Sequence, residues 1–181
     1  MRHDIHELIA LFGALFGESD GTELVRGDKE PVYLPRDAAW PQDRVVFAHG
    51  FFASALHEVA HWCVAGRARR RLPDYGYWYQ PDGRSPDEQR AFEAVEVKPQ
   101  ALEWLFSRAA DLPFHFSADN LDAGGAVTSA AWLQFQRNVA AQAQSYLTRG
   151  LPARAARFAR ALSERYGTTD AWRDGALYRI D

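Results

Sequence analysis

The string HEVAH brings His57, Glu58 and His61 into five consecutive residues, and it is the strongest chemical signal in the chain. On a helix, two imidazoles four residues apart project about 40° from one another and can bind one metal ion. A random sequence of this composition would contain about 0.01 such motifs. The motif therefore predicts that His57 and His61 are metal ligands and that Glu58 is a catalytic residue. The alternative is a pair of hydrogen-bonded core histidines.

A mononuclear catalytic site with two histidines needs a further protein ligand, and a carboxylate is a common choice. The next predicted helix, over residues 86–97, begins with a capping-box pattern and has proline at its first position. Its glutamates are Glu88, Glu93 and Glu96. Glu96 projects about 40° from the apolar Phe92, whereas Glu93 projects about 100° from it. We therefore expect Glu96 to be the third ligand, the alternative being an exposed carboxylate.

Pro99 is expected to end this helix near Val97, because a proline disfavours helical geometry in the residue before it. A further helix is predicted from Ala101 to about Pro113, and a single helix kinked at Pro99 is the alternative. With a break at Pro99, Glu96 would lie close to a helix C-terminus, where the helix dipole disfavours an anion unless a cation compensates.

The ligand set alone leaves the metal and the reaction open, because two histidines and a carboxylate serve both zinc hydrolases and iron oxygenases. In a zinc metallopeptidase, Glu58 would be the general base for the attacking water. In an oxygenase, Glu58 would orient a ligand or a bound water. A non-catalytic protein with a structural metal would need a fourth ligand, which the sequence does not supply in an obvious way.

The composition is that of one globular domain spanning residues 1–181, with 47% hydrophobic and 25% charged residues. No apolar run approaches the ~18–20 residues of a membrane span, and acidic residues near the N-terminus argue against a signal peptide. A single cysteine, Cys63, excludes an internal disulfide and fits a reducing compartment, so we expect a cytoplasmic protein. The net charge of −3 favours neither nucleic acid nor membrane binding.

Hydrophobic periodicity predicts a mainly helical α+β fold with a small sheet. Helices are expected over residues 4–16, 51–64, 128–149 and 152–165 in addition to those flanking Pro99, and short strands over 23–26, 32–34 and 44–48. The helix 51–64 carries HEVAH and is apolar almost all round, which predicts burial. Gly66 is expected to close this helix at the C′ position. Cys63 is expected to be a small core residue.

Four strings, GDKEPVYLP, RVVFAHGFFASALHEVAHWCVAG, DYGYWYQPDGR and FEAVEVKPQALEWLF, strongly resemble the bacterial elongation factor P hydroxylase family. The resemblance runs from about residue 5 to residue 165. It implies an oxygen-dependent hydroxylase that acts on the already β-lysylated lysine of elongation factor P, as the last step of that modification. It also implies a zincin-like metal-binding helix, with His57, His61 and Glu96 as ligands. Iron is expected because oxygen is activated, with zinc as the alternative.

Five further residues are weaker candidates for substrate binding. Arg69 and Arg70 could dock an acidic protein, although a solvated charge run is equally expected. Tyr77 and Trp78 could line a groove for a long modified lysine, or they could simply pack. His49 lies eight residues before His57 and could contact substrate, the alternative being a hydrogen-bonded structural histidine.

Overall fold

The protein is described by a computed structural model, which covers residues 3–75, 86–117 and 129–180. Its described part is mainly helical with one small sheet, which confirms the predicted α+β class. The helices are α1 (Ile5–Phe16), α2 (Phe52–Val64), α3 (Pro86–Ala109), α4 (Ser129–Arg149) and α5 (Ala153–Tyr166). The strands are β1 (Thr22–Arg26), β2 (Val32–Leu34) and β3 (Asp43–Phe47), and short 3-10 turns are η1 (Arg69–Arg71), η2 (Ala171–Arg173) and η3 (Gly175–Leu177).

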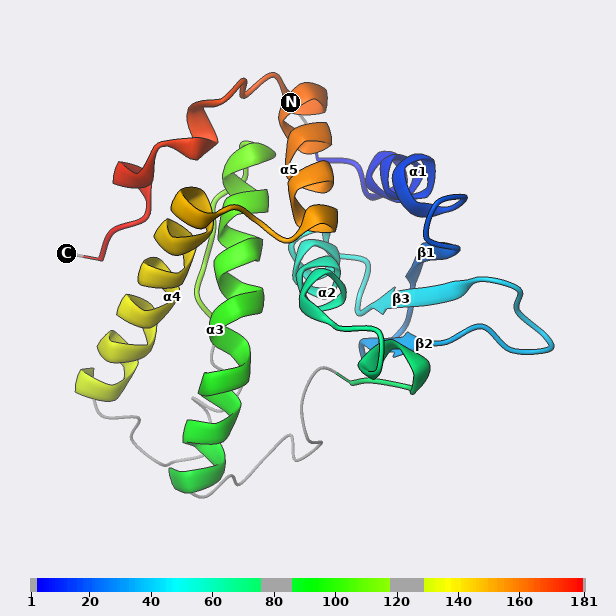
Figure 1. The fold of residues 1–181 in the computed structure, drawn as a ribbon, viewed down its shortest axis with the longest axis horizontal. Coiled ribbons are helices and arrows are strands. Elements are labelled where there is room, and N and C mark those ends of the chain that lie inside the picture. The colour runs from blue at the N-terminus through cyan, green and yellow to red at the C-terminus, as the bar shows by residue number, and fades with distance from the viewer. Residues whose placement is uncertain (1–2, 76–85, 118–128, 181) are drawn as a thin grey trace.

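The sheet has the strand order β1-β3-β2, with β1 parallel and β2 antiparallel to β3. Side chains alternate between the two faces, and Leu24, Val45 and Phe47 are buried. α1 packs on β1 and α2 packs on β3, so the sheet lies on the side of α2 that faces away from α4 (Figure 1). The sheet therefore supports α2, the helix that carries HEVAH.

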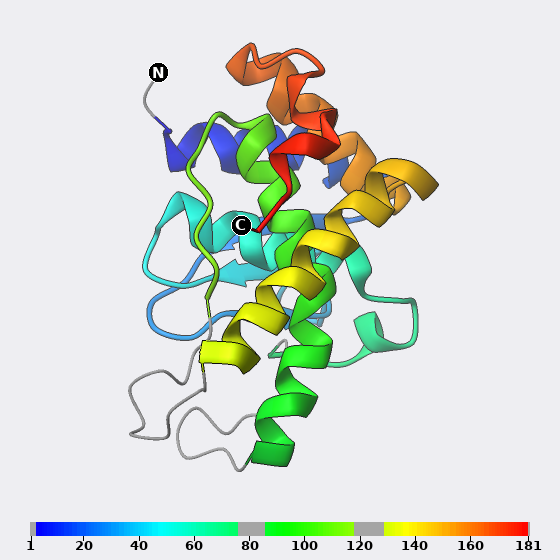
Figure 2. The ribbon, with the colours of Figure 1, turned by 90° about the vertical axis from the view of Figure 1, so that its left-hand side faces the viewer.

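The long helix α3 occupies the middle of the molecule, between α2 and α4 (Figures 1 and 2). The predicted break at Pro99 is wrong, because α3 continues through it as one helix. Pro99 is buried, and packing against α2 and α4 supports a turn that proline would destabilise in an isolated helix. Glu96 therefore lies in the interior of a helix, and the expected unfavourable helix dipole does not apply to it.

Aromatic side chains from four helices build the core next to α2. Trp62 contacts Phe12 and Phe16 of α1 with ring centroids 5.2 and 4.9 Å away. Phe158 of α5 contacts Phe106 of α3 at 5.0 Å. Edge-on aromatic pairs of this kind add to the free energy gained by burying the rings. They hold α1, α2, α3 and α5 in fixed relative positions, which a site shared by α2 and α3 requires.

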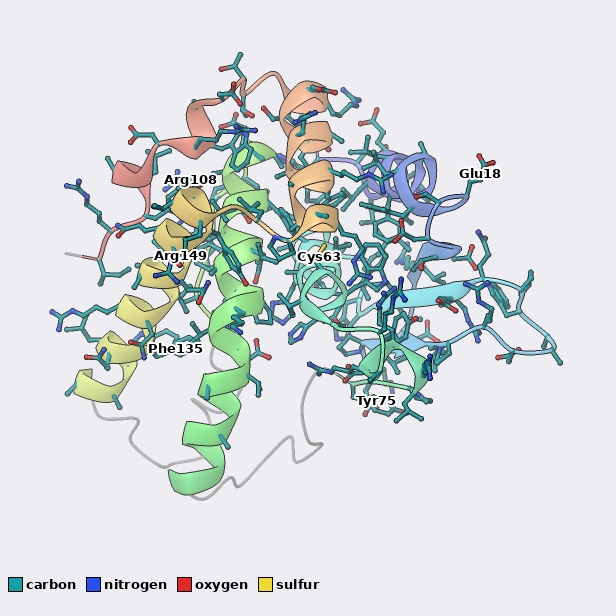
Figure 3. All side chains as sticks on the ribbon, in the orientation of Figure 1. Glu18, Cys63, Tyr75, Arg108, Phe135 and Arg149 are labelled. Atoms are coloured by element: carbon teal, nitrogen blue, oxygen red, sulfur yellow. The ribbon has the colours of Figure 1, made fainter. Side chains whose placement is uncertain are left out.

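The C-terminal end of α2 is capped by a side chain from α5. The C-cap residue Ala65 is extended, and Gly66 follows it at the C′ position, as predicted, but without the positive φ of a left-handed cap. Arg154 instead donates to the backbone oxygens of Ala65, at 2.8 Å, and Cys63, at 3.4 Å, and its guanidinium lies 4.2 Å from the Trp62 ring centre. The Cys63 side chain is buried beside this cap, as predicted (Figure 3).

Most other boundaries agree closely with the sequence, although α3 ends at Ala109, before the predicted end near Pro113. α5 ends at Gly167, which has φ 70°, the left-handed conformation that glycine adopts without strain. In the described part of the chain, no helix has the length and apolar character needed to cross a membrane.

Candidate metal centre

Four polar side chains from α2 and α3 meet at the interface of these helices. α2 contributes His57 and His61, one turn apart, and α3 contributes Glu96 and Glu103, two turns apart. Residues seven apart on a helix differ by only about 20° in direction, so both glutamates project toward α2. The α2–α3 contact is the most extensive between any two of the described elements. These four side chains are therefore positioned by the packing of two helices.

The three predicted ligands lie within 4.8 Å of one another, each offering one donor atom. His57 Nε2 is 3.0 Å from His61 Nε2. Glu96 Oε1 is 3.2 Å from His61 Nε2, and Glu96 Oε2 is 3.6 Å from His57 Nε2. Glu96 is 2% exposed and His61 is 9% exposed. The Glu96 carboxylate and the His61 imidazole are thus buried, the His57 imidazole is partly buried, and one donor atom of each lies close to the other two.

These distances fit a shared small metal ion. Donor atoms bound at about 2.1 Å are separated by roughly 3.0–3.4 Å when their bonds subtend 90–110°. The buried Glu96 Oε1 lies 3.2 Å from His61 Nε2, yet no described group hydrogen-bonds to it in good geometry. A buried carboxylate oxygen without a hydrogen bond is costly, and metal ligation is one way in which it is satisfied. The donor set therefore suits a divalent metal.

The charges in the metal-free site follow from burial and from the opposite charges nearby. Burial opposes protonation of His57, but the carboxylates of Glu103 and Glu96 outweigh it and raise the His57 pKa to about 10. Burial opposes ionisation of Glu96, but His61 and His57 outweigh it and lower the Glu96 pKa to about 2. In the absence of metal, a protonated His57 can donate from Nδ1 to Glu103 and from Nε2 to His61.

Glu103 is the residue of this cluster that the sequence analysis missed. Its Oε2 accepts a hydrogen bond from His57 Nδ1 at 2.8 Å, and the residue is 8% exposed. The signal that could have found it is its spacing from Glu96, since seven residues place the two carboxylates on one helix face. The predicted break at Pro99 concealed this relation, because it assigned Glu96 and Glu103 to different helices.

Glu58 lies on α2 next to the ligands and is half-buried. Burial raises its pKa, against the opposing charges of His57 and His61. Together with His61, Tyr33 and Asp74 it lines a small cavity of about 20 Å³. A cavity of this size holds about one water molecule, so Glu58 is placed to hydrogen-bond a water beside His61.

None of the weaker candidates contacts a proposed ligand among the interactions of the described residues, and two of them lie outside those residues. His49 is exposed before α2, with φ 57°, and its ring centre is 6.0 Å from that of Phe51. Arg69 forms an ion pair with Asp74, and the backbone oxygen of Arg70 accepts from the Tyr33 hydroxyl, so both lie in a packed turn. Tyr77 and Trp78 lie outside the described residues, just after Tyr75, which is below α2 in Figure 3.

Comparison with known proteins identifies a family of oxidoreductases. The family described as elongation factor P hydroxylase matches residues 11–174. A protein of Haemophilus influenzae named elongation factor P lysine hydroxylase is 48% identical over 170 residues, which is 94% of this chain and 93% of the relative. The chain belongs to the elongation factor P hydroxylase family. The match extends beyond residue 165, where the sequence resemblance was expected to end.

Proposed function

We propose that this protein hydroxylates the β-lysylated lysine side chain of elongation factor P, as the last step of that modification. The observation that carries the proposal is a buried cluster of two histidines and one glutamate in a chain of this family. The relative from Haemophilus influenzae supports the same substrate through its name. Neither comparison favours the zinc metallopeptidase that HEVAH alone would allow.

The proposed cofactor is one divalent metal held by His57, His61 and Glu96. The fit rests on the donor separations of 3.0–3.6 Å and on the buried oxygen of Glu96. Two imidazoles and a carboxylate suit either metal, and the need to activate oxygen in a hydroxylation favours Fe²⁺ over Zn²⁺. When bound, Fe²⁺ would supply the activation of molecular oxygen that insertion into a C–H bond requires. In this proposal α2 acts as a zincin-like metal-binding helix.

The chain's own residues have separate roles in this proposal. His57, His61 and Glu96 would hold the metal through three donor atoms that lie within 4.8 Å of one another, and a metal with three protein ligands would keep coordination positions for other groups. Glu58 orients a water in the small cavity next to His61. The half-buried side chain of His57, 21% exposed, lies where the cluster opens to the surface. The fixed helices α2 and α3 preorganise these groups, so that little reorganisation is needed during turnover.

The protein substrate requires a surface around the site. We propose that His49, Arg69, Arg70, Tyr77 and Trp78 contribute to it as substrate contacts. In this proposal the chain is a single domain that acts in the cytoplasm, where translation factors are made. It uses no direct contact with nucleic acid.

The test is hydroxylation of β-lysylated elongation factor P by the purified protein with Fe²⁺, air and a reductant. Glu96→Gln removes the proposed anionic ligand while keeping the size of the side chain, and Ser107→Ala is a control on the same helix. We expect no hydroxylation by Glu96→Gln and full activity of Ser107→Ala. Unchanged activity of Glu96→Gln, in a folded variant, would refute the assignment of Glu96.

A further inference from the structure

The two histidines of the proposed metal centre differ in what contacts their outer ring nitrogens. His57 Nδ1 donates to Glu103 Oε2 at 2.8 Å. His61 Nδ1 is buried and, among the described residues, has no hydrogen-bond partner. Glu103 is itself buried, and a carboxylate is not placed in a core without a partner for its charge. The Glu103–His57 contact is therefore a specific feature of this site.

We propose that Glu103 is the positioning residue for His57, and this inference rests on the proposed metal centre. A neutral imidazole carries one N–H, and the carboxylate keeps that proton on Nδ1. The lone pair of Nε2 then faces His61 and Glu96, which is the form that binds a metal. Glu103 also fixes the orientation of the ring and makes Nε2 a stronger donor.

One continuous helix carries both carboxylates. Glu96 and Glu103 are seven residues apart on α3, so both project toward α2. Glu96 faces the proposed metal position, and Glu103 contacts Nδ1 of the His57 ring. The distance of Glu103 from His57 is therefore fixed by the same α2–α3 packing that fixes Glu96. A positioning residue on this rigid element holds its ligand more firmly than one on a loop.

The test measures metal affinity and does not depend on turnover. Metal-free wild type, Glu103→Ala, Glu103→Gln and the control Ser107→Ala are titrated with Co²⁺ against a chromophoric chelator. Loss of an outer carboxylate typically weakens metal binding by about 10- to 100-fold, and we expect Glu103→Ala in this range when affinities are extrapolated to their high-pH limits, where no proton on His57 competes with the metal. Glu103→Gln keeps an oxygen that can accept from Nδ1–H, so its affinity should be largely restored. Ser107, buried one turn further along α3, should be without effect.

The visible absorption spectrum of bound Co²⁺ gives a second readout, because it reports on ligand geometry. It should change in Glu103→Ala and return toward the wild-type form in Glu103→Gln. Unfolding of the metal-free proteins identifies a merely structural effect, which would lower stability and leave the Co²⁺ affinity and spectrum unchanged. If Glu103→Ala does not fold, Glu103→Asp, with its shorter reach, takes its place.

The outcomes separate this inference from the proposed function. Equal Co²⁺ affinity and spectra in wild type and all Glu103 variants would overturn the role of Glu103 while leaving the metal centre intact. Equal losses in the Ala and Gln variants would also overturn it, because positioning predicts rescue by the amide. Absence of Co²⁺ binding to the wild type would refute the metal centre itself, and this inference with it.

Discussion

Metal binding to the proposed centre should release about one proton per site at pH 7.5. In the metal-free site the pKa of His57 is about 10, because Glu103 and Glu96 outweigh the effect of burial. His57 is then protonated in nearly all molecules at pH 7.5. Metal needs the Nε2 lone pair, so it must displace this proton. The apparent affinity at pH 7.5 should therefore lie well below its high-pH limit.

The sign of the pH effect follows from the same displacement. Between pH 7 and 9 the affinity should rise about tenfold per pH unit and level off near the pKa of His57. Isothermal titration calorimetry in two buffers of different ionisation enthalpy gives the number of protons released. The variant Glu103→Gln removes one of the two carboxylates that raise this pKa, so its affinity should level off at a lower pH. A pH-independent affinity with no proton release would refute this reasoning.

Three further predictions concern catalysis and stability. Glu58→Gln should lower hydroxylation by less than about tenfold in a mass-spectrometric assay, because the amide can still orient a water; a loss of about 10²–10⁴-fold would indicate a general base. Arg154→Ala should lower the free energy of unfolding by about 2–3 kcal/mol in urea titrations, through lost capping and Trp62 contacts, while Co²⁺ affinity stays unchanged. In metal-free protein, the stabilisation from protonated His57 should be complete below pH about 6.5 and be lost as pH rises to about 10, as urea titrations across this range would reveal. A metal-free stability that increases over this range would contradict the charge assignment.

Local sequence patterns predicted the elements that position the site. The spacing in HEVAH placed His57 and His61 on one helix face, and the apolar residues around them predicted that α2 is buried. Glycine marked the end of α5 correctly, because Gly167 supplies a left-handed residue where the chain must turn. Gly66 also follows α2 as predicted, but it is not left-handed, and Arg154 satisfies the terminal carbonyls from nearly a hundred positions further along the chain. Such a tertiary cap has no local sequence signal.

The incomplete prediction of the site has a single physical cause. Proline usually ends a helix, but the packing of α2 and α4 on α3 supports the turn at Pro99. With a break at Pro99, the helical wheel still predicted correctly that Glu96 projects toward the core. The same break concealed Glu103, because it assigned this residue to a different helix. If α3 is treated as one continuous helix, the seven-residue spacing between Glu96 and Glu103 is visible in the sequence. Residues that contact the protein substrate could not be predicted in this way, because they lie on surfaces that packing does not determine.

The central claim is most directly tested by the intact mass of β-lysylated elongation factor P after aerobic incubation with this protein, Fe²⁺ and a reductant. His57→Ala, checked for folding, is the matched control. A gain of the mass of one oxygen atom with the wild type, and no gain with His57→Ala, is the predicted result. An equal gain with both proteins, or none with an iron-loaded wild type supplied with a competent reductant, would contradict the account.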